Sequence, residues 1–177
     1  MRSLTRFSLF LVGILLVSWI VRAALFRAVV SYHIVGSRSA VASLDPNTNA
    51  PKDIEGFVDE VLGTTAEWLH FSVGPVSNDP VKLVPGSPAN CIGYAALFSA
   101  LLKGYLQRSG LDDHYSVEPV IAKLYVGGLD LHSSFNSPFW KDHDIVRIKN
   151  LKDGSFLYVD PTLFDATGIR RVRGVAK

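Results

Sequence analysis

The stretch from Cys91 to Gly110, CIGYAALFSALLKGYLQRSG, limits the possible folds of this chain more than any other segment. Its residues are apolar on nearly every side as far as Leu102, and polar residues return only towards its end. A helix of this composition must be covered on all its faces, so we expect it at the centre of a domain. Asn90 suits the N-cap position and Gly110 the C-terminal cap. The sequence therefore predicts a buried helix that begins at Cys91.

The segments around this helix predict an α+β domain. Apolar residues from Lys52 to Phe71 recur at helical spacing and indicate a second helix with one buried face. After the central helix the composition changes to that of strands, and the last two are joined by a Lys-Asp-Gly turn typical of a hairpin. Pro119 indicates a bulge or a sheet edge. Two helices followed by an antiparallel sheet form an α+β domain. The expected strands are residues 115–126, 144–149 and 156–159.

The N-terminal residues differ in character from the rest of the chain. Residues 7–21 are a mostly apolar run without a charge, and arginines lie on both sides of it. Continued to Phe26, the run has about 20 residues, which is enough to cross a bilayer with Arg22 reaching the headgroups. We therefore expect residues 1–30 to be a retained, single-pass membrane anchor or signal anchor.

Two other interpretations of this run stay open, a cleaved secretory signal and a buried core helix. A small-residue site exists at residues 40–42, Ala-Val-Ala, but it lies far from the end of the apolar run. Because a short N-terminal tail usually stays cytoplasmic, we expect the folded domain on the extracytoplasmic side. Residues 31–52, which include the polar SLDPNTNAP, are predicted to be a linker, and residues 53–177 the folded domain.

The distribution of charge also separates the N-terminal residues from the rest of the chain. All 16 acidic residues lie at or after Asp45, whereas five of the 18 basic residues precede it. The later part therefore has 13 basic against 16 acidic residues, a net charge of −3, and no basic stripe with interleaved aromatic residues, so we expect no nucleic-acid partner. The single cysteine excludes an intramolecular disulfide and a cysteine-rich zinc site, and the five histidines are scattered. We expect neither a metal nor a cofactor.

Three residues suggest a thiol catalytic site. Cys91 begins the buried helix, where unpaired N–H groups and the helix dipole favour a thiolate and can hold an oxyanion. His143 opens the strand HDIVRI, and Asp160 closes its hairpin partner FLYVD, so both side chains reach the same edge of the sheet. An aspartate on one ring nitrogen leaves the other free to take the thiol proton. We expect Cys91 as nucleophile, His143 as base and Asp160 as the residue that orients the histidine.

The same segments resemble the transglutaminase-like superfamily. The segments CIGYAALFSALLKGYL, DHDIVRI and LYVDPT follow the order of its cysteine helix, histidine-led strand and V-D-P-T segment. The resemblance covers roughly residues 53–164, and the D-P-T segment is its most specific part. It implies a papain-like fold, in which the cysteine helix packs on a small antiparallel sheet. It also implies an oxyanion helper upstream of the cysteine, for which Trp68 and Asn90 are the candidates.

The function implied by this resemblance is a membrane-anchored thiol enzyme that acts on amide bonds of a protein or peptide. The enzyme would form an acyl-enzyme, which water resolves in a cysteine peptidase or amidase and an amine resolves in acyl transfer. We prefer hydrolysis of the two. The sequence sets no oligomeric state.

Other hypotheses remain. A catalytically lapsed transglutaminase-like domain could serve as a binding or scaffold module in a membrane complex. This alternative is motivated by Ala89, where the family often has glycine, and by Ile145, where it usually has an aromatic residue. His132, within the long segment 127–142, could replace His143 as the base. A structural membrane protein with an incidental thiol is a further possibility.

Overall fold

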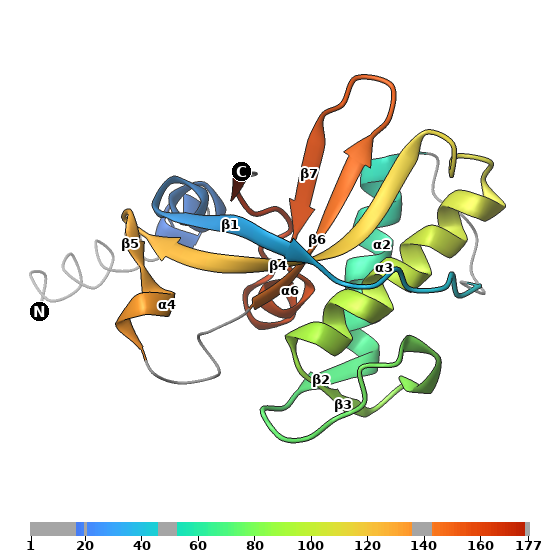
Figure 1. Cartoon of the computed structure of the whole chain (residues 1–177), viewed down its shortest axis with the longest axis horizontal. Coiled ribbons are helices and arrows are strands. Elements are labelled where there is room, and N and C mark those ends of the chain that lie inside the picture. The colour runs from blue at the N-terminus through green and yellow to red at the C-terminus, as the bar shows by residue number, and fades with distance from the viewer. Residues whose placement is uncertain (1–16, 20, 46–52, 136–142, 176–177) are drawn as a thin grey trace, which may run out of the picture.

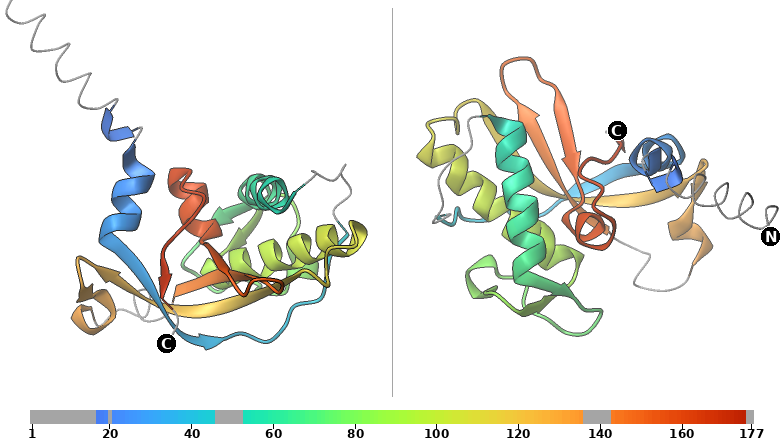
Figure 2. Two further views of the ribbon diagram at one scale, coloured as in Figure 1. Left: turned by 90° about the horizontal axis from the view of Figure 1, so that it is seen from above. Right: turned by 180° about the vertical axis from the view of Figure 1, so that it is seen from behind.

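The computed structural model describes residues 17–19, 21–45, 53–135 and 143–175. It is a mixed α+β fold with a curled sheet and three helices that contact one another (Figure 1). Figure 2 shows these helices on the same side of the sheet. The predicted α+β class is confirmed. The three helices are α2 (Ile54–Trp68), α3 (Cys91–Arg108) and α6 (Pro161–Thr167).

The main sheet has the strand order β7-β6-β4-β1-β8, and β5 pairs with β4 beside this path. Every pairing is antiparallel except that of β1 with β8. The strands are β1 (Val30–Ser37), β4 (Tyr115–Val126), β5 (Leu129–Asp130), β6 (His143–Asn150), β7 (Phe156–Val159) and β8 (Gly174–Val175). The long strand β4 therefore connects the hairpin of β6 and β7 to the N-terminal strand β1.

The central helix α3 is confirmed in position and burial. It begins at Cys91 with Asn90 as its N-cap, and Gly110 follows its C-terminal end with a positive φ of 66°. The helix contacts α2, β4, β6 and α6, which explains why its sequence is apolar on almost every side. Its largest fully buried side chains are Tyr94, Tyr105, Phe98, Leu97, Leu102 and Leu106.

The first helix is shorter than its sequence pattern predicts. α2 ends at Trp68, and the next residues form β2 (Leu69–Phe71), which pairs in parallel with β3 (Ser87–Ala89). The change from helix to strand is abrupt, since Leu69 is already extended while its N–H still bonds to the carbonyl of Thr65. The remaining short elements are η1 (Pro80–Lys82) and α4 (Leu131–Ser134).

Pro119 lies inside β4, which has partners on both sides. It pairs with Val146 of β6, and its carbonyl accepts a 3.0 Å hydrogen bond from the N–H of Arg38. The pairing of β1 with β4 ends at Ser37 and Val120, so Pro119 lies just beyond it. The missing N–H of Pro119 therefore removes no bond from this ladder. The expected edge is wrong, because β4 is an interior strand, and the register shift of this pairing lies at Ile34 and Gly36.

The linker predicted for residues 31–52 is wrong over its first part. Residues 30–37 form β1, an interior strand, and Leu44 donates a backbone hydrogen bond to Ala100 of α3. The folded part therefore begins well before residue 53. Val30, Tyr32 and Ile34 are buried and alternate with more exposed neighbours, which is a strand pattern that directly follows the apolar N-terminal run.

The predicted membrane anchor falls largely outside the described residues. Residues 17–19 and 21–29 are helical, and we call the latter the N-terminal helix. Within the ranges that the structure describes, no helix combines the length and the hydropathy needed to cross a membrane. The anchor over residues 1–30 and its orientation stay predictions.

Candidate active site

The structure brings the three predicted site residues together from three elements. Cys91 is the first residue of α3, His143 is the first residue of β6, and Asp160 is the N-cap of α6, directly after β7. Nε2 of His143 lies 2.6 Å from Oδ2 of Asp160. The side chain of Cys91, which is partly buried, also interacts with the imidazole and raises its pKa. Because Asp160 occupies Nε2, Nδ1 is the ring nitrogen left for the sulfur.

The hairpin explains how His143 and Asp160 meet. In its register Val146 pairs with Val159, and the pairing continues towards the turn as far as Lys149 and Phe156. The first residue of β6 and the residue that follows β7 therefore lie at the same end of the hairpin. The expected position of both residues at one edge of the sheet follows from this register.

Asp160 is buried, with 1% of its surface exposed, and both oxygens of its carboxylate are hydrogen-bonded. Oδ2 accepts a 2.8 Å hydrogen bond from the hydroxyl of Tyr32, besides its bond with His143. Oδ1 accepts a 3.0 Å bond from the N–H of Leu163 in the first turn of α6. Burial alone raises the pKa of Asp160, but the charge of His143 and these hydrogen bonds outweigh it, so the pKa is lowered. The carboxylate stays ionised and fixed in direction.

His143 is held in its charged form. Its side chain is 28% exposed. Burial lowers the pKa of His143, but the negative charge of Asp160 and the hydrogen bonds with Asp160 and Cys91 raise it to about 10. At neutral pH the imidazole is therefore protonated and lies between a carboxylate and a sulfur. This is the charge distribution that accompanies a thiolate–imidazolium pair.

The first turn of α3 offers fewer free N–H groups than the sequence suggests. Oδ1 of Asn90 accepts hydrogen bonds from the N–H groups of Ile92 at 3.1 Å and Gly93 at 3.2 Å. The N–H of Tyr94 bonds to the backbone carbonyl of Asn90. Asn90 is thus the N-cap through Oδ1, and its role as an oxyanion donor stays a prediction. Of this first turn, only the N–H of Cys91 is not used by the contacts described.

Gly93 allows a close approach of the loop that precedes α3. A Cβ atom at this position would lie 3.1 Å from Cβ of Ala89 and 3.3 Å from the backbone oxygen of Ser77. Both distances are tighter than ordinary van der Waals contact. The small residue two positions after Cys91 therefore packs the loop directly against the start of the helix.

Sequence reasoning missed two tyrosines that support the site. Tyr32 of β1 bonds to Asp160, and Tyr94 of α3 donates a 2.6 Å hydrogen bond to Asp165 of α6. Burial and the bond to Asp165 raise the pKa of Tyr94, so its hydroxyl keeps its proton. Tyr94 thus ties the start of the cysteine helix to the helix that Asp160 caps. The alternation of VSYHI around Tyr32 is the signal that could have revealed β1.

The other two residues that the sequence suggests for the site are Trp68 and His132. Trp68 is the last residue of α2 and packs against the larger hydrophobic core, so its role as an oxyanion helper stays a prediction. His132 lies in α4, whereas the buried carboxylate of Asp160 bonds to His143. Residues 136–142, the rest of the segment that carries His132, lie outside the described residues. Within the described part of the chain, no cluster of three or more His, Cys, Asp or Glu side chains could hold a metal ion.

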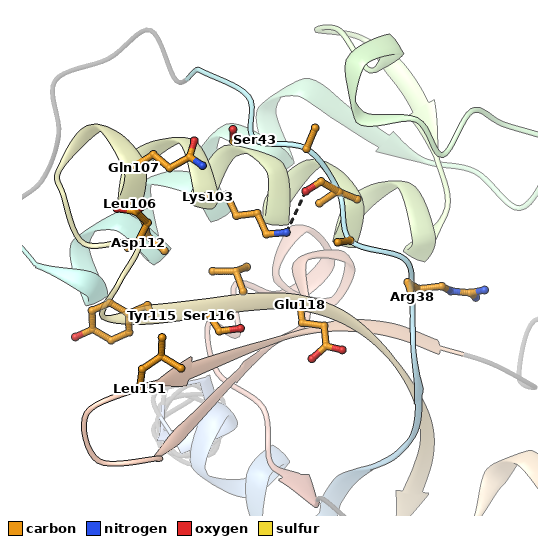
Figure 3. A pocket seen from close by; sticks show the side chains of 14 residues that line it. Arg38, Ser43, Lys103, Leu106, Gln107, Asp112, Tyr115, Ser116, Glu118 and Leu151 are labelled. Carbon is orange, nitrogen blue, oxygen red and sulfur yellow. Dashed lines mark hydrogen bonds between the residues drawn. The ribbon is translucent and has the colours of Figure 1, made fainter.

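Of two pockets in the described structure, one is lined by residues of the candidate site and the other is not. A cavity of about 350 Å³ has Tyr32, His143 and Asp160 in its wall. A larger one, of about 760 Å³, lies between α3 and β4 beneath the segment after β1 (Figure 3). There Nζ of Lys103 donates a 3.0 Å hydrogen bond to the carbonyl of Val41, and no residue of the proposed triad contributes to the wall. We therefore place the candidate active site at the smaller cavity.

No family model, no curated protein and no solved structure matches this chain. The resemblance to the transglutaminase-like superfamily therefore depends on the three sequence segments. The geometry of Cys91, His143 and Asp160 is a separate observation, which does not depend on that resemblance.

Proposed function

We propose that this protein is a transglutaminase-like thiol enzyme that acts on amide bonds through an acyl-enzyme. The observation that carries the proposal is the position of His143, which bonds to the buried carboxylate of Asp160 and interacts with the side chain of Cys91. A lone buried cysteine needs no such partner. A charged imidazole held beside the only thiol of the chain is the arrangement that activates a sulfur nucleophile.

Each proposed step assigns a proton to a described group. The thiolate of Cys91 attacks the carbonyl carbon and forms a C–S bond, and the N–H of Cys91 stabilises the carbonyl oxygen as it becomes negative. The imidazolium of His143 gives its proton to the amine as the C–N bond breaks. A water then gives a proton to His143 and attacks the thioester, which releases a carboxylic acid and restores the thiolate. Asp160 keeps the ring oriented throughout.

The packing of α3 supports the papain-like part of the proposal. α3 contacts β4 and β6 of the antiparallel sheet, and the hairpin of β6 and β7 supplies the histidine and the aspartate. The two departures from the family pattern, Ala89 and Ile145, are both completely buried. We infer that these positions act through packing, so they give no separate reason to prefer a lapsed binding module.

We further propose that the enzyme is held at a membrane by its N-terminal segment. Five large apolar residues on the described part of this segment are exposed: Val17, Trp19, Val21, Leu25 and Val29. Their exposure suits a helix that continues into a lipid phase. If the domain lies outside the cytoplasm, a membrane-impermeant maleimide labels Cys91 in intact cells. Labelling only after lysis would contradict this orientation.

Turnover of p-nitrophenyl acetate tests the proposed chemistry. We expect an acetyl group on Cys91, detected by intact mass after acid quenching, and release of more than one p-nitrophenolate per chain. Cys91→Ala should remove both signals, and His143→Ala should remove the turnover. Added amine separates the two outcomes, because an acetylated amine indicates acyl transfer and acetate indicates hydrolysis.

Two results would contradict this proposal. The first is a wild-type chain that forms no acetyl adduct at Cys91, and the second is an adduct that is never released. The first result would mean that the thiol is unreactive. The second would favour the binding-module alternative, since a lapsed site can be acylated once without turnover.

A further inference from the structure

The cavity beside His143 has a wall that is mainly apolar. Its apolar residues come from four separate segments, namely the N-terminal helix, β2, β4 and α6. They are Phe26, Phe71, Leu124, Leu163 and Ala166. Because four segments contribute to this wall, the cavity is formed by the tertiary fold and not by a single loop.

The polar side chains in this wall are largely bonded to protein groups. The Tyr32 hydroxyl and the His143 ring both bond to Asp160. Asp165 accepts the hydrogen bond of Tyr94. Oγ1 of Thr162, a residue of the same wall, is buried and has no hydrogen-bond partner among the described residues. The cavity therefore offers apolar contact over most of its wall and one polar group without a partner.

The cavity also lies next to the reacting atoms. His143 and Asp160 line it, and the Cys91 side chain, which is not part of its wall, interacts with the same imidazole. We infer that a group carried by a carbonyl that reacts with Cys91 reaches the cavity beside His143. Its volume of about 350 Å³ lies at the lower end of the range for small-molecule sites, roughly 300–1,000 Å³.

We propose that this cavity is a specificity pocket for one apolar side chain, aliphatic or aromatic, next to the amide bond that is attacked. The inference rests on the proposed function, in which the substrate is a protein or peptide. Burial of apolar surface favours such a side chain by about fourfold in rate for each fully buried methylene group. We therefore expect a leucyl or phenylalanyl substrate to react at least tenfold faster than a glycyl one.

The N-terminal helix supplies part of this pocket. Phe26 lines the cavity, and Nε of Arg22 donates a 3.3 Å hydrogen bond to the carbonyl of Thr167 at the end of α6. Figure 2 shows this helix beside α6. The segment expected to anchor the protein thus also shapes its substrate pocket, so the full chain, in lipid nanodiscs, is the form to test.

Chloromethyl ketones test the pocket because they alkylate the single thiol irreversibly. The second-order rate constant for Cys91 is measured with acetyl-glycyl, acetyl-leucyl, acetyl-phenylalanyl and acetyl-aspartyl chloromethyl ketones. We expect the leucyl and phenylalanyl reagents to exceed the glycyl reagent at least tenfold and the aspartyl reagent by more. Equal rates for the leucyl and glycyl reagents would overturn the proposal. So would a straight-chain alkyl chloromethyl ketone that reacts faster than both apolar peptide reagents, because it would indicate a lipid acyl group instead.

Two variants test whether the preference for apolar side chains arises in this cavity. Ala166→Phe, an exposed position in the wall, should fill the pocket and reduce the leucyl-to-glycyl ratio towards one. Phe26→Ala should enlarge it and move the preference from leucyl to phenylalanyl. The matched control, Ala42→Phe, places the same ring at an exposed residue of the other cavity and should leave the ratio unchanged. A ratio that neither Ala166→Phe nor Phe26→Ala changes would also overturn the proposal.

Iodoacetamide separates this inference from the proposed function, because the reagent carries no apolar side chain. Slow alkylation of the wild-type chain, or alkylation that does not depend on His143, would mean that the proposed thiol chemistry fails. Rapid, His143-dependent alkylation together with equal leucyl and glycyl rates would leave that chemistry intact and remove only the pocket's role.

Discussion

The Tyr32 hydroxyl lies 2.8 Å from Oδ2 of Asp160, a residue 128 positions further along the chain. The same oxygen is bonded to Nε2 of His143 at 2.6 Å. The hydrogen bond from Tyr32 therefore helps to fix the position of the Asp160 carboxylate relative to the imidazole. Through this bond the N-terminal strand β1 becomes part of the proposed active site.

Replacing Tyr32 with phenylalanine should destabilise the fold. A hydrogen bond to a charged group contributes about 1.5–3 kcal/mol, and we expect Tyr32→Phe to lower the free energy of unfolding by this amount. Urea denaturation at pH 7 measures it. Tyr125→Phe is the matched control, because the Tyr125 hydroxyl lies 3.4 Å from Asp130, a long contact. A loss no larger in Tyr32→Phe than in Tyr125→Phe would contradict the role given to Tyr32.

Asp160→Asn should be more costly than Tyr32→Phe. It removes the charge that faces the protonated imidazole of His143 and leaves that charge without its buried partner, which costs about 3–5 kcal/mol. Denaturant unfolding gives the loss of stability, and the rate of Cys91 alkylation should fall in the same variant. Asp153→Asn, in the exposed turn between β6 and β7, should change the stability by less than about 0.5 kcal/mol. Equal losses in the two variants would argue against a buried ion pair.

The contribution of His143 to stability should fall with rising pH. The pKa of this histidine is about 10 in the folded protein, against about 6.5 in an unfolded chain. A group with a raised pKa stabilises the fold fully below its unfolded value, and this contribution is lost as the pH rises through the folded value. In the wild type the proton lost by the Cys91 thiol offsets this effect, so the test is made in Cys91→Ala, whose free energy of unfolding should fall between pH 6.5 and pH 9. His143→Gln in the same background should show a smaller fall, and identical profiles would contradict the assigned charge.

Asn90 should matter for the thiol as well as for the helix. Loss of an N-cap costs about 0.5–2 kcal/mol, so Asn90→Ala should destabilise the protein to about the same extent as Asp53→Ala at the start of α2. Only Asn90→Ala should alter the alkylation rate of Cys91, because it releases two N–H groups next to the sulfur. Equal alkylation rates in the two variants would show that Asn90 acts on stability alone.

The parts of the site that the sequence predicts are those set by local patterns. The composition of α3 predicts its burial, Asn90 predicts its start, and a tight turn predicts the register that aligns His143 with Asp160. Each of these relations lies within one helix or one hairpin, where periodicity and turn chemistry decide the geometry. The approach of Cys91 to His143 is not local, and the sequence indicates it only through the order of the segments.

The missed parts depend on contacts between distant segments. β1 pairs with β4, some 90 residues later, and with β8 near the C-terminus, and neither partner is visible in its own short pattern. Tyr32 could not be linked to Asp160 without that pairing. Similarly, the helical spacing that predicts α2 continues through Leu69, but pairing with β3 ends the helix at Trp68. Tertiary pairing overrides local propensity at both positions.

The alkylation of Cys91 by iodoacetamide, followed against pH in the wild type and in His143→Ala, tests the central claim most directly. Cys91 is the only thiol, so the site of reaction is unambiguous. A thiolate–imidazolium pair predicts fast alkylation at pH 6.5, where an ordinary thiol with a pKa of about 8.5 is almost entirely protonated, and a loss of roughly tenfold or more in His143→Ala. Slow alkylation of the wild type at this pH, or the same rate in the variant, would contradict the proposed active site.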